Sequence, residues 1–139
     1  ILPISEAIRT ILLECGIEEK LLHKVPSGVI TDVAPPGDRA ALRRELGGDA
    51  THLVGCIGHL AEHKGHRFLL EALPGVLKLF PGMKLVIVGE GELRDDLAER
   101  AKFLEISQSV VFTGFREDAA DLIRAFDLYV HPSRLEGLA

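Results

Sequence analysis

The sequence has no tryptophan, one tyrosine and two cysteines among its 139 residues. Because aromatic side chains are so few, the core that its 47% hydrophobic residues can form must be aliphatic. Cys15 and Cys56 are far apart and fit neither a CxxC nor a metal-ligand spacing. Cys56 lies inside an apolar run and is expected to be a buried core thiol, which fits a reducing, cytosolic setting.

The chain also lacks a long apolar run and an excess of basic residues. No stretch approaches the ~18 apolar residues of a membrane span, and no signal peptide begins the chain. The net charge is −5 and the basic residues are scattered, which argues against a nucleic-acid partner. Any phosphate on a substrate must therefore be held by a few placed cations and by backbone N–H groups.

Residues 1–50 contain two predicted helices separated by loop-forming sequence. Ser5 is a suitable N-cap for a helix over residues 6–15, and Asp38 for a helix over residues 39–46. The proline- and glycine-rich stretch between them is typical of a linker. These residues do not share the regular pattern that follows.

We therefore divide the chain into three parts. Residues 1–24 are expected to end a preceding domain, and residues 25–50 to form a hinge and the first helix of a second domain. Residues 51–139 are expected to form that second domain, incomplete at its C-terminus because the chain stops before the helix that should follow its last strand.

From residue 51 onward, apolar strands alternate with helical patterns. Every strand is a continuous apolar run, as expected for a sheet that is buried on both faces. Helices that connect such strands imply a parallel, doubly wound, Rossmann-like α/β sheet. The strands are predicted over 52–57, 85–88, 110–112 and 128–130, and the helices over 68–80, 92–104 and 117–126.

Two of these helices carry more detailed predictions. Pro74-Gly75 interrupts the first helix and should kink it without ending it. The last helix is expected to turn one apolar side inward, formed by Ala119, Leu122, Ile123 and Phe126.

The turn after the first strand, Gly58–Gly65, has the residues of a phosphate site. Gly58 permits close approach of a ligand, and Gly65 precedes a helix whose N-terminus favours an anion. Lys64 supplies a point charge suited to a phosphate. The alternative is an ordinary turn with a solvated lysine.

Two further glycine turns follow the second and third strands. Gly89-Glu90-Gly91 lacks the GxGxxG pattern of dinucleotide-binding proteins, and a plain tight turn is the favoured interpretation of Glu90. After the third strand, Phe115 and Arg116 could border a flat base by stacking and backbone hydrogen bonds. The alternative is a partly buried phenylalanine beside a solvated arginine.

The fourth strand runs directly into the polar segment HPSRLEGL. Ligands bind at the carboxyl ends of parallel strands, which favours a site here. The Glu136 carboxylate can accept hydrogen bonds from hydroxyl groups, Gly137 allows the backbone to approach, and the Leu138 N–H can face a phosphate. The alternative is a mobile surface carboxylate. His59, His63 and His66 do not share one helical face, so no metal site is predicted.

Several of these segments occur together in an order that resembles the retaining glycosyltransferases of family 4, which have the two-domain GT-B architecture. The resemblance is carried by Gly58-x-Leu60 with Lys64-Gly65, then LVIVGEGELRDDL, VVFTGF and HPSRLEG. ISEAIRTILLECGI resembles the close of that family's first domain, and VPSGV resembles its hinge. The resemblance covers nearly the whole chain.

The resemblance implies a donor site for a nucleotide-diphosphate sugar, with no metal or other cofactor. Lys64 would contact the diphosphate, and His59 stands where the family usually has an arginine that pairs with the same phosphates. Phe115 and Arg116 would lie along the base. Glu136, the candidate catalytic residue, matches the first carboxylate of the family's Glu-x7-Glu motif; Gly58, Gly137 and Leu138 complete the predicted donor site.

The implied reaction is transfer of a hexosyl group to an acceptor hydroxyl with retention of anomeric configuration. The acceptor would be a glycan, a lipid or a small molecule, bound chiefly by a missing N-terminal domain. The expected location is the cytoplasm, with peripheral contact of the full-length enzyme at the inner membrane face. This part is expected to be inactive alone. The alternative is a Rossmann-type nucleotide-binding or structural module without catalysis, with His59 as the trace of lost donor chemistry.

Overall fold

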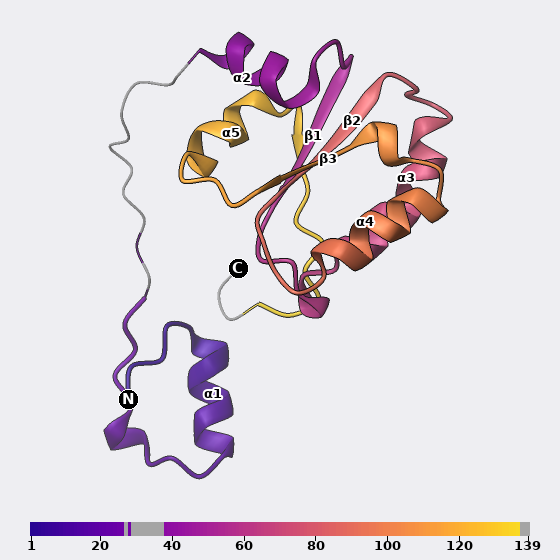
Figure 1. Ribbon diagram of the computed structural model, residues 1–139. Helices are drawn as coiled ribbons and strands as arrows, with labels where there is room; N and C mark the ends of the chain where they lie inside the picture. Colours follow the sequence, from indigo (N-terminus) through magenta and orange to yellow (C-terminus); the bar gives the residue numbers. More distant parts are fainter. Residues whose placement is uncertain (27, 29–37, 137–139) are drawn as a thin grey trace. The chain divides into compact units, whose positions relative to one another are not determined.

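The computed structural model describes residues 1–26, 28 and 38–136 (Figure 1). The chain divides into two compact units: Ile1–Ala34 with Leu135–Ala139, and Pro35–Arg134. No helix in the described ranges is long and apolar enough to cross a membrane.

The first unit contains helix α1 (Glu6–Glu14) and the short helix η1 (Glu19–Leu21). The Ser5 hydroxyl oxygen accepts a hydrogen bond from the Ile8 N–H at 3.3 Å, which confirms the predicted N-cap. Gly16 follows the helix with a φ of +83°, a conformation that favours glycine.

The second unit is built on a four-stranded parallel sheet. Its strands are β1 (His52–Ile57), β2 (Met83–Val88), β3 (Val110–Gly114) and β4 (Leu128–Tyr129), in the order β3-β2-β1-β4. All three pairings are parallel, which confirms the predicted α/β class. The strand order reverses between β1 and β4, so the carboxyl edge of the sheet has its topological switch point there.

Helices cover the two faces of this sheet (Figure 1). Along β2, Leu85 and Ile87 pack on one face, whereas Val86 and Val88 pack on the other, and all four are buried. This two-sided burial explains the continuous apolar runs of the sequence. The first face is covered by α3 (His66–Leu77) and α4 (Arg94–Phe103), the second by α2 (Arg39–Gly47) and α5 (Ala119–Ala125).

The helix boundaries follow local capping and turn chemistry. Asp38 accepts hydrogen bonds from two N–H groups of the first turn of α2, as predicted. Helix α3 runs on through Pro74, although it begins two residues before the predicted start and ends at Leu77. Helix α4 starts later than predicted because the Leu93 N–H bonds the Leu60 carbonyl, which holds the preceding residues in a turn.

Two predictions of burial are wrong. Leu128 is 58% exposed and Tyr129 is 40% exposed, because β4 pairs with β1 alone and has no neighbour on its other side within the described residues. Leu122 in α5 is buried, as is Phe126, the residue that follows the helix. Ile123 is 47% exposed. Ala125 takes its place in the core, because a short helix presents only a narrow side to the sheet.

The loops on either side of the switch point are packed tightly together. The Arg134 N–H donates to the His63 carbonyl at 2.8 Å. Gly65 has a φ of +71°, and a Cβ there would lie 2.3 Å from the Pro132 carbonyl oxygen. Only glycine fits this contact, so the turn after β1 and the segment after β4 form one connected edge.

Candidate functional site

A cavity of about 500 Å³ opens at the carboxyl ends of β1, β2 and β3. It lies where parallel α/β sheets bind ligands, and its walls combine apolar strand ends with a few polar groups. The residues that line it are Ile57, Gly58, His59, Val88, Gly89, Glu90, Phe115, Arg116 and Ala119. Four predicted site residues, Gly58, His59, Phe115 and Arg116, are thus brought together.

One side of the cavity, here called the glycine side, comprises the lining residues Gly58 and Gly89 together with Leu60 and Gly91 from the same two turns. Gly89 has a φ of +134°, and a Cβ on it would lie 2.1 Å from the Gly58 carbonyl oxygen. The Leu60 N–H donates to the Glu90 carbonyl at 2.8 Å. The turns after β1 and β2 are therefore joined through their backbones, with no room for a side chain between them.

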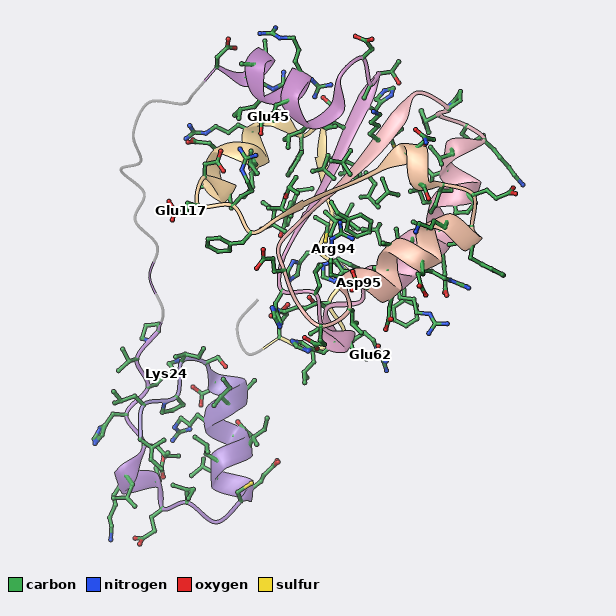
Figure 2. All side chains as sticks on the ribbon, in the orientation of Figure 1. Lys24, Glu45, Glu62, Arg94, Asp95 and Glu117 are labelled. Carbon is green, nitrogen blue, oxygen red and sulfur yellow. The ribbon has the colours of Figure 1, made fainter. Side chains whose placement is uncertain are left out.

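The other side, here called the charged side, comprises the lining residues Phe115 and Arg116 together with Asp118 and Glu45, which bind Arg116. The Arg116 guanidinium donates two hydrogen bonds of 2.7 Å to the Asp118 carboxylate and another to Glu45. Glu45 comes from α2, on the part of that helix that approaches α5 (Figure 2). The bond to Asp118, followed by that to Glu45, raises the pKa of Arg116, and Arg116 in turn lowers the pKa of Asp118.

This arrangement decides what Arg116 can do. Its charge is balanced by two carboxylates, so the side chain is suited to forming a rigid planar wall and poorly suited to binding a phosphate. The alternative expectation is a partly buried Phe115 beside a solvated Arg116, and the structure shows neither. Phe115 is 68% exposed, and Arg116 is paired with two carboxylates. An exposed ring beside a fixed guanidinium can stack against a flat base.

His59 and Lys64 occupy different parts of the turn after β1. His59 lines the cavity, and its Nε2 lies 3.2 Å from a carboxylate oxygen of Glu92. Lys64 ends the short helix η2 (Glu62–Lys64), immediately before Gly65 and α3, and is not among the residues that line the cavity. The turn therefore reaches from the cavity towards the switch point.

The segment after β4 carries a second group of polar side chains. The Tyr129 hydroxyl donates to the Ile57 carbonyl at 3.3 Å and lies 3.2 Å from His131 Nδ1. Ser133 Oγ lies 3.1 Å from His131 Nε2. These contacts hold the His131 ring at the strand exit.

The remaining predicted residues belong to the end of the chain. Glu136 is exposed and is not among the residues that line the cavity. Gly137 and Leu138 lie outside the described residues. All three remain predictions.

His66, the first residue of α3, is the only polar or charged side chain that is buried among the described residues. It is 2% exposed, and neither ring nitrogen has a hydrogen-bond partner there. Burial lowers its pKa, and the charges of His131 and Lys64 lower it further. The ring is therefore neutral near pH 7.

The structure also describes the Cys56 thiol and the side chains that could bind a metal ion. Burial raises the pKa of the Cys56 thiol to about 11, in keeping with the predicted core thiol. In the ranges that the structure describes, no group of three or more His, Cys, Asp or Glu side chains is arranged to hold a metal ion.

Sequence reasoning missed four contributors to the site. The sequence favours a plain turn at Glu90, but this residue lines the cavity. Asp118 and Ala119 lie just beyond the recognised turn, and Glu45 is 71 positions from Arg116, so no local pattern connects them. An Arg-x-Asp spacing after a strand was the one available signal, since it allows the bidentate pair.

Comparison with known proteins shows the family of the chain. Residues 51–139 match the family of Glycosyl transferases group 1. The chain belongs to this family.

Two curated relatives show the degree of similarity. The GDP-mannose-dependent alpha-(1-6)-phosphatidylinositol monomannoside mannosyltransferase of Mycolicibacterium smegmatis is 34% identical, over 84% of this chain and 31% of its own length. Mannosylfructose-phosphate synthase of Agrobacterium fabrum is 31% identical, over 87% of this chain and 29% of its own length. The chain thus spans about a third of the length of these relatives.

Solved glycosyltransferases share the fold. Anabaena HepE, in complex with UDP and glucose, superposes with a TM-score of 0.83 at 27% identity, covering 95% of this chain and 37% of that one. WaaG, a glycosyltransferase involved in lipopolysaccharide biosynthesis, superposes with a TM-score of 0.79 at 23% identity, covering 98% of this chain and 38% of that one. The fold of the group 1 domain is the Rossmann-like fold of GT-B enzymes.

Proposed function

We propose that this chain is the donor-binding part of a hexosyltransferase that uses a nucleotide-diphosphate sugar and retains the anomeric configuration. The observation that carries the proposal is the cavity at the carboxyl edge, where Gly58, His59, Phe115 and Arg116 converge. Relatives support a nucleoside diphosphate as the common element: one is named for GDP-mannose, and the HepE structure holds UDP.

Each part of the cavity is suited to one part of such a donor. The exposed Phe115 ring and the fixed Arg116 plane offer a stacking surface for the base. The glycine side lets the ligand approach backbone groups closely. His59 and Lys64 then follow along the turn and can bind the two phosphates, one of which would replace Glu92 as the partner of His59.

The sugar end of the donor is assigned to the segment after β4. We propose that Glu136 faces the sugar as the catalytic carboxylate and that the Gly137 and Leu138 backbone contacts the distal phosphate. The leaving diphosphate is stabilised by cationic side chains and helix N-termini, with no metal ion. Addition of EDTA is expected to leave donor binding unchanged, and loss of binding would contradict a metal-free site.

Binding of the acceptor, a glycan, lipid or small molecule, is assigned to an N-terminal domain of the same protein. We propose that the protein acts in the cytoplasm, with peripheral contact at the inner membrane face. Without its partner domain the donor half has an incomplete cleft, so weak donor binding and little transfer are expected from it alone.

Calorimetry with UDP and GDP tests the proposal. Lys64→Ala is expected to weaken binding of the preferred nucleotide by about tenfold, because one charge-assisted phosphate contact is lost. Lys78→Ala, which removes an exposed lysine just beyond the other end of α3, is the matched control and should bind normally.

The outcomes separate the proposed enzyme from a non-catalytic module. Turnover of a sugar nucleotide by the full-length protein supports the enzyme, and nucleotide binding without turnover supports the module. Equal affinity in Lys64→Ala and Lys78→Ala would remove Lys64 from the site.

A further inference from the structure

Both ring nitrogens of His66 are buried without a hydrogen-bond partner among the residues that the structure describes. An imidazole buried without hydrogen bonds destabilises the folded state, because water satisfied both ring nitrogens in the unfolded chain. An apolar side chain of similar size would fill the same space without that cost. A buried group of this kind calls for an explanation outside packing.

The surroundings of the ring favour an anion. His66 begins α3, a helix of 12 residues, whose first N–H groups and dipole attract negative charge. Lys64 lies two residues before it, and His131 approaches from the segment after β4. Both neighbouring charges disfavour a proton on His66, and no carboxylate contributes to its shift.

The position of the ring places this anion at the switch point. The turn that leads into α3 lies against the segment after β4 through the Gly65–Pro132 contact and the bond from Arg134 to His63. His66 follows Gly65 directly, so it begins α3 beside the place where these two loops meet, at the switch point between β1 and β4. The cavity begins on the same turn, at Gly58 and His59, and can hold the base end of a donor.

From these observations we infer that His66 is a further donor-binding residue: its ring N–H hydrogen-bonds a phosphate oxygen of the bound nucleotide at the start of α3, beside Lys64. This inference rests on the proposed function and adds a residue that the sequence did not suggest. The bound phosphate gives the ring a hydrogen-bond partner, and because the ring is 2% exposed, its contact with a ligand requires a local movement of the groups that cover it.

Two consequences distinguish this role from a purely structural one. His66→Leu should raise the melting temperature, because a buried polar group without partners is removed, and should weaken UDP or GDP binding by about tenfold. In addition, the negative charge of a bound phosphate opposes the positive charges of Lys64 and His131. The pKa of His66 should therefore rise, and the ring should take up a proton when the nucleotide binds. Calorimetry in buffers of different ionisation enthalpy measures that uptake.

The experiment compares wild type, His66→Leu and His52→Leu in the full-length protein. His52→Leu makes the same change at the opposite end of β1, where the ring is exposed and lies against Phe80, so nucleotide binding should not change. Each variant is titrated with the nucleoside diphosphate and with the matching nucleoside. Only the diphosphate should respond to His66→Leu, because the proposed contact is to phosphate.

Each result decides between the alternatives. Equal nucleotide affinity in His66→Leu and His52→Leu overturns the inference, as does an equal loss for the nucleoside without phosphates. If His66→Leu fails to fold, nitrogen NMR of the wild-type ring decides: a raised pKa of His66 on adding UDP or GDP supports the contact, and an unchanged one refutes it. Failure of wild type to bind any nucleotide would instead refute the proposed function.

Discussion

The two sides of the cavity are held in place by different physical means. On the glycine side, backbone meets backbone, and a single added methyl group at Gly89 has no space. On the charged side, Arg116 is fixed by carboxylates from its own turn and from α2, while Phe115 remains exposed. The first side is fixed by steric exclusion and the second by ion pairs that water and salt can weaken.

This difference predicts how each side responds to change. Alteration of the glycine side should disturb the fold before it disturbs binding, because two strand ends are locked through it. Alteration of the charged side should affect ligand recognition with little effect on stability, since exposed ion pairs contribute little to folding. Three variants test the contrast, from the largest expected effect to the smallest.

Gly89→Ala should be the most damaging. The new Cβ would lie 2.1 Å from the Gly58 carbonyl oxygen, and the φ of +134° is unfavourable for alanine. We expect the free energy of unfolding to fall by about 3 kcal/mol, measured by urea denaturation. Gly75→Ala is the matched control, because a Cβ at this helical position meets nothing within 4 Å and should stabilise the protein by up to about 1 kcal/mol. Similar losses in both variants would contradict steric exclusion at Gly89.

Phe115→Ala should lower nucleotide affinity without lowering stability. Loss of a stacking ring costs about 1–3 kcal/mol of base binding, which corresponds to roughly tenfold or more in Kd. Because the ring is 68% exposed, the free energy of unfolding should change by less than about 0.5 kcal/mol. Phe103→Ala removes another exposed ring, on α4, and should leave the affinity unchanged. Unaltered nucleotide affinity in Phe115→Ala would exclude stacking on this ring.

Asp118→Asn should have the smallest overall effect of the three variants, a fall in the free energy of unfolding of less than about 1 kcal/mol at pH 7. Arg116 lowers the pKa of Asp118 below its ordinary value of 3.8, so the carboxylate stabilises the fold above that pH. This contribution is lost as the pH falls through the folded-state pKa. The difference between wild type and variant, measured by urea denaturation, should therefore vanish in acid.

Asp121→Asn is the control for this variant. Asp121 makes one long bond, of 3.5 Å, to Arg124, and its removal should have less effect than removal of the Asp118 pair at neutral pH. A difference between wild type and Asp118→Asn that grows in acid would show that the carboxylate acts by some other means.

The sequence predicted the parallel sheet because that information is local. Continuous apolar runs separated by helical patterns are read directly from neighbouring residues, as are the caps at Ser5 and Asp38. Gly58, His59, Phe115 and Arg116, which line the cavity, could be proposed as site residues for the same reason, since each follows a strand. The expected burial of β4 and Ile123 failed because burial depends on which neighbours a strand or helix has.

Only the tertiary structure revealed what balances and completes the site. Glu45 reaches Arg116 from a helix 71 positions away, and Glu90 reaches the cavity because the turns after β1 and β2 are joined. In the sequence His66 is one of several neighbouring histidines, but the fold buries its ring without a hydrogen-bond partner in the described part of the chain. The sequence determined which turns contain polar side chains, since residue types and the ends of apolar strands can be identified from neighbouring positions. The fold decided which of those groups meet and which lose their water, because contact and desolvation depend on distances in space.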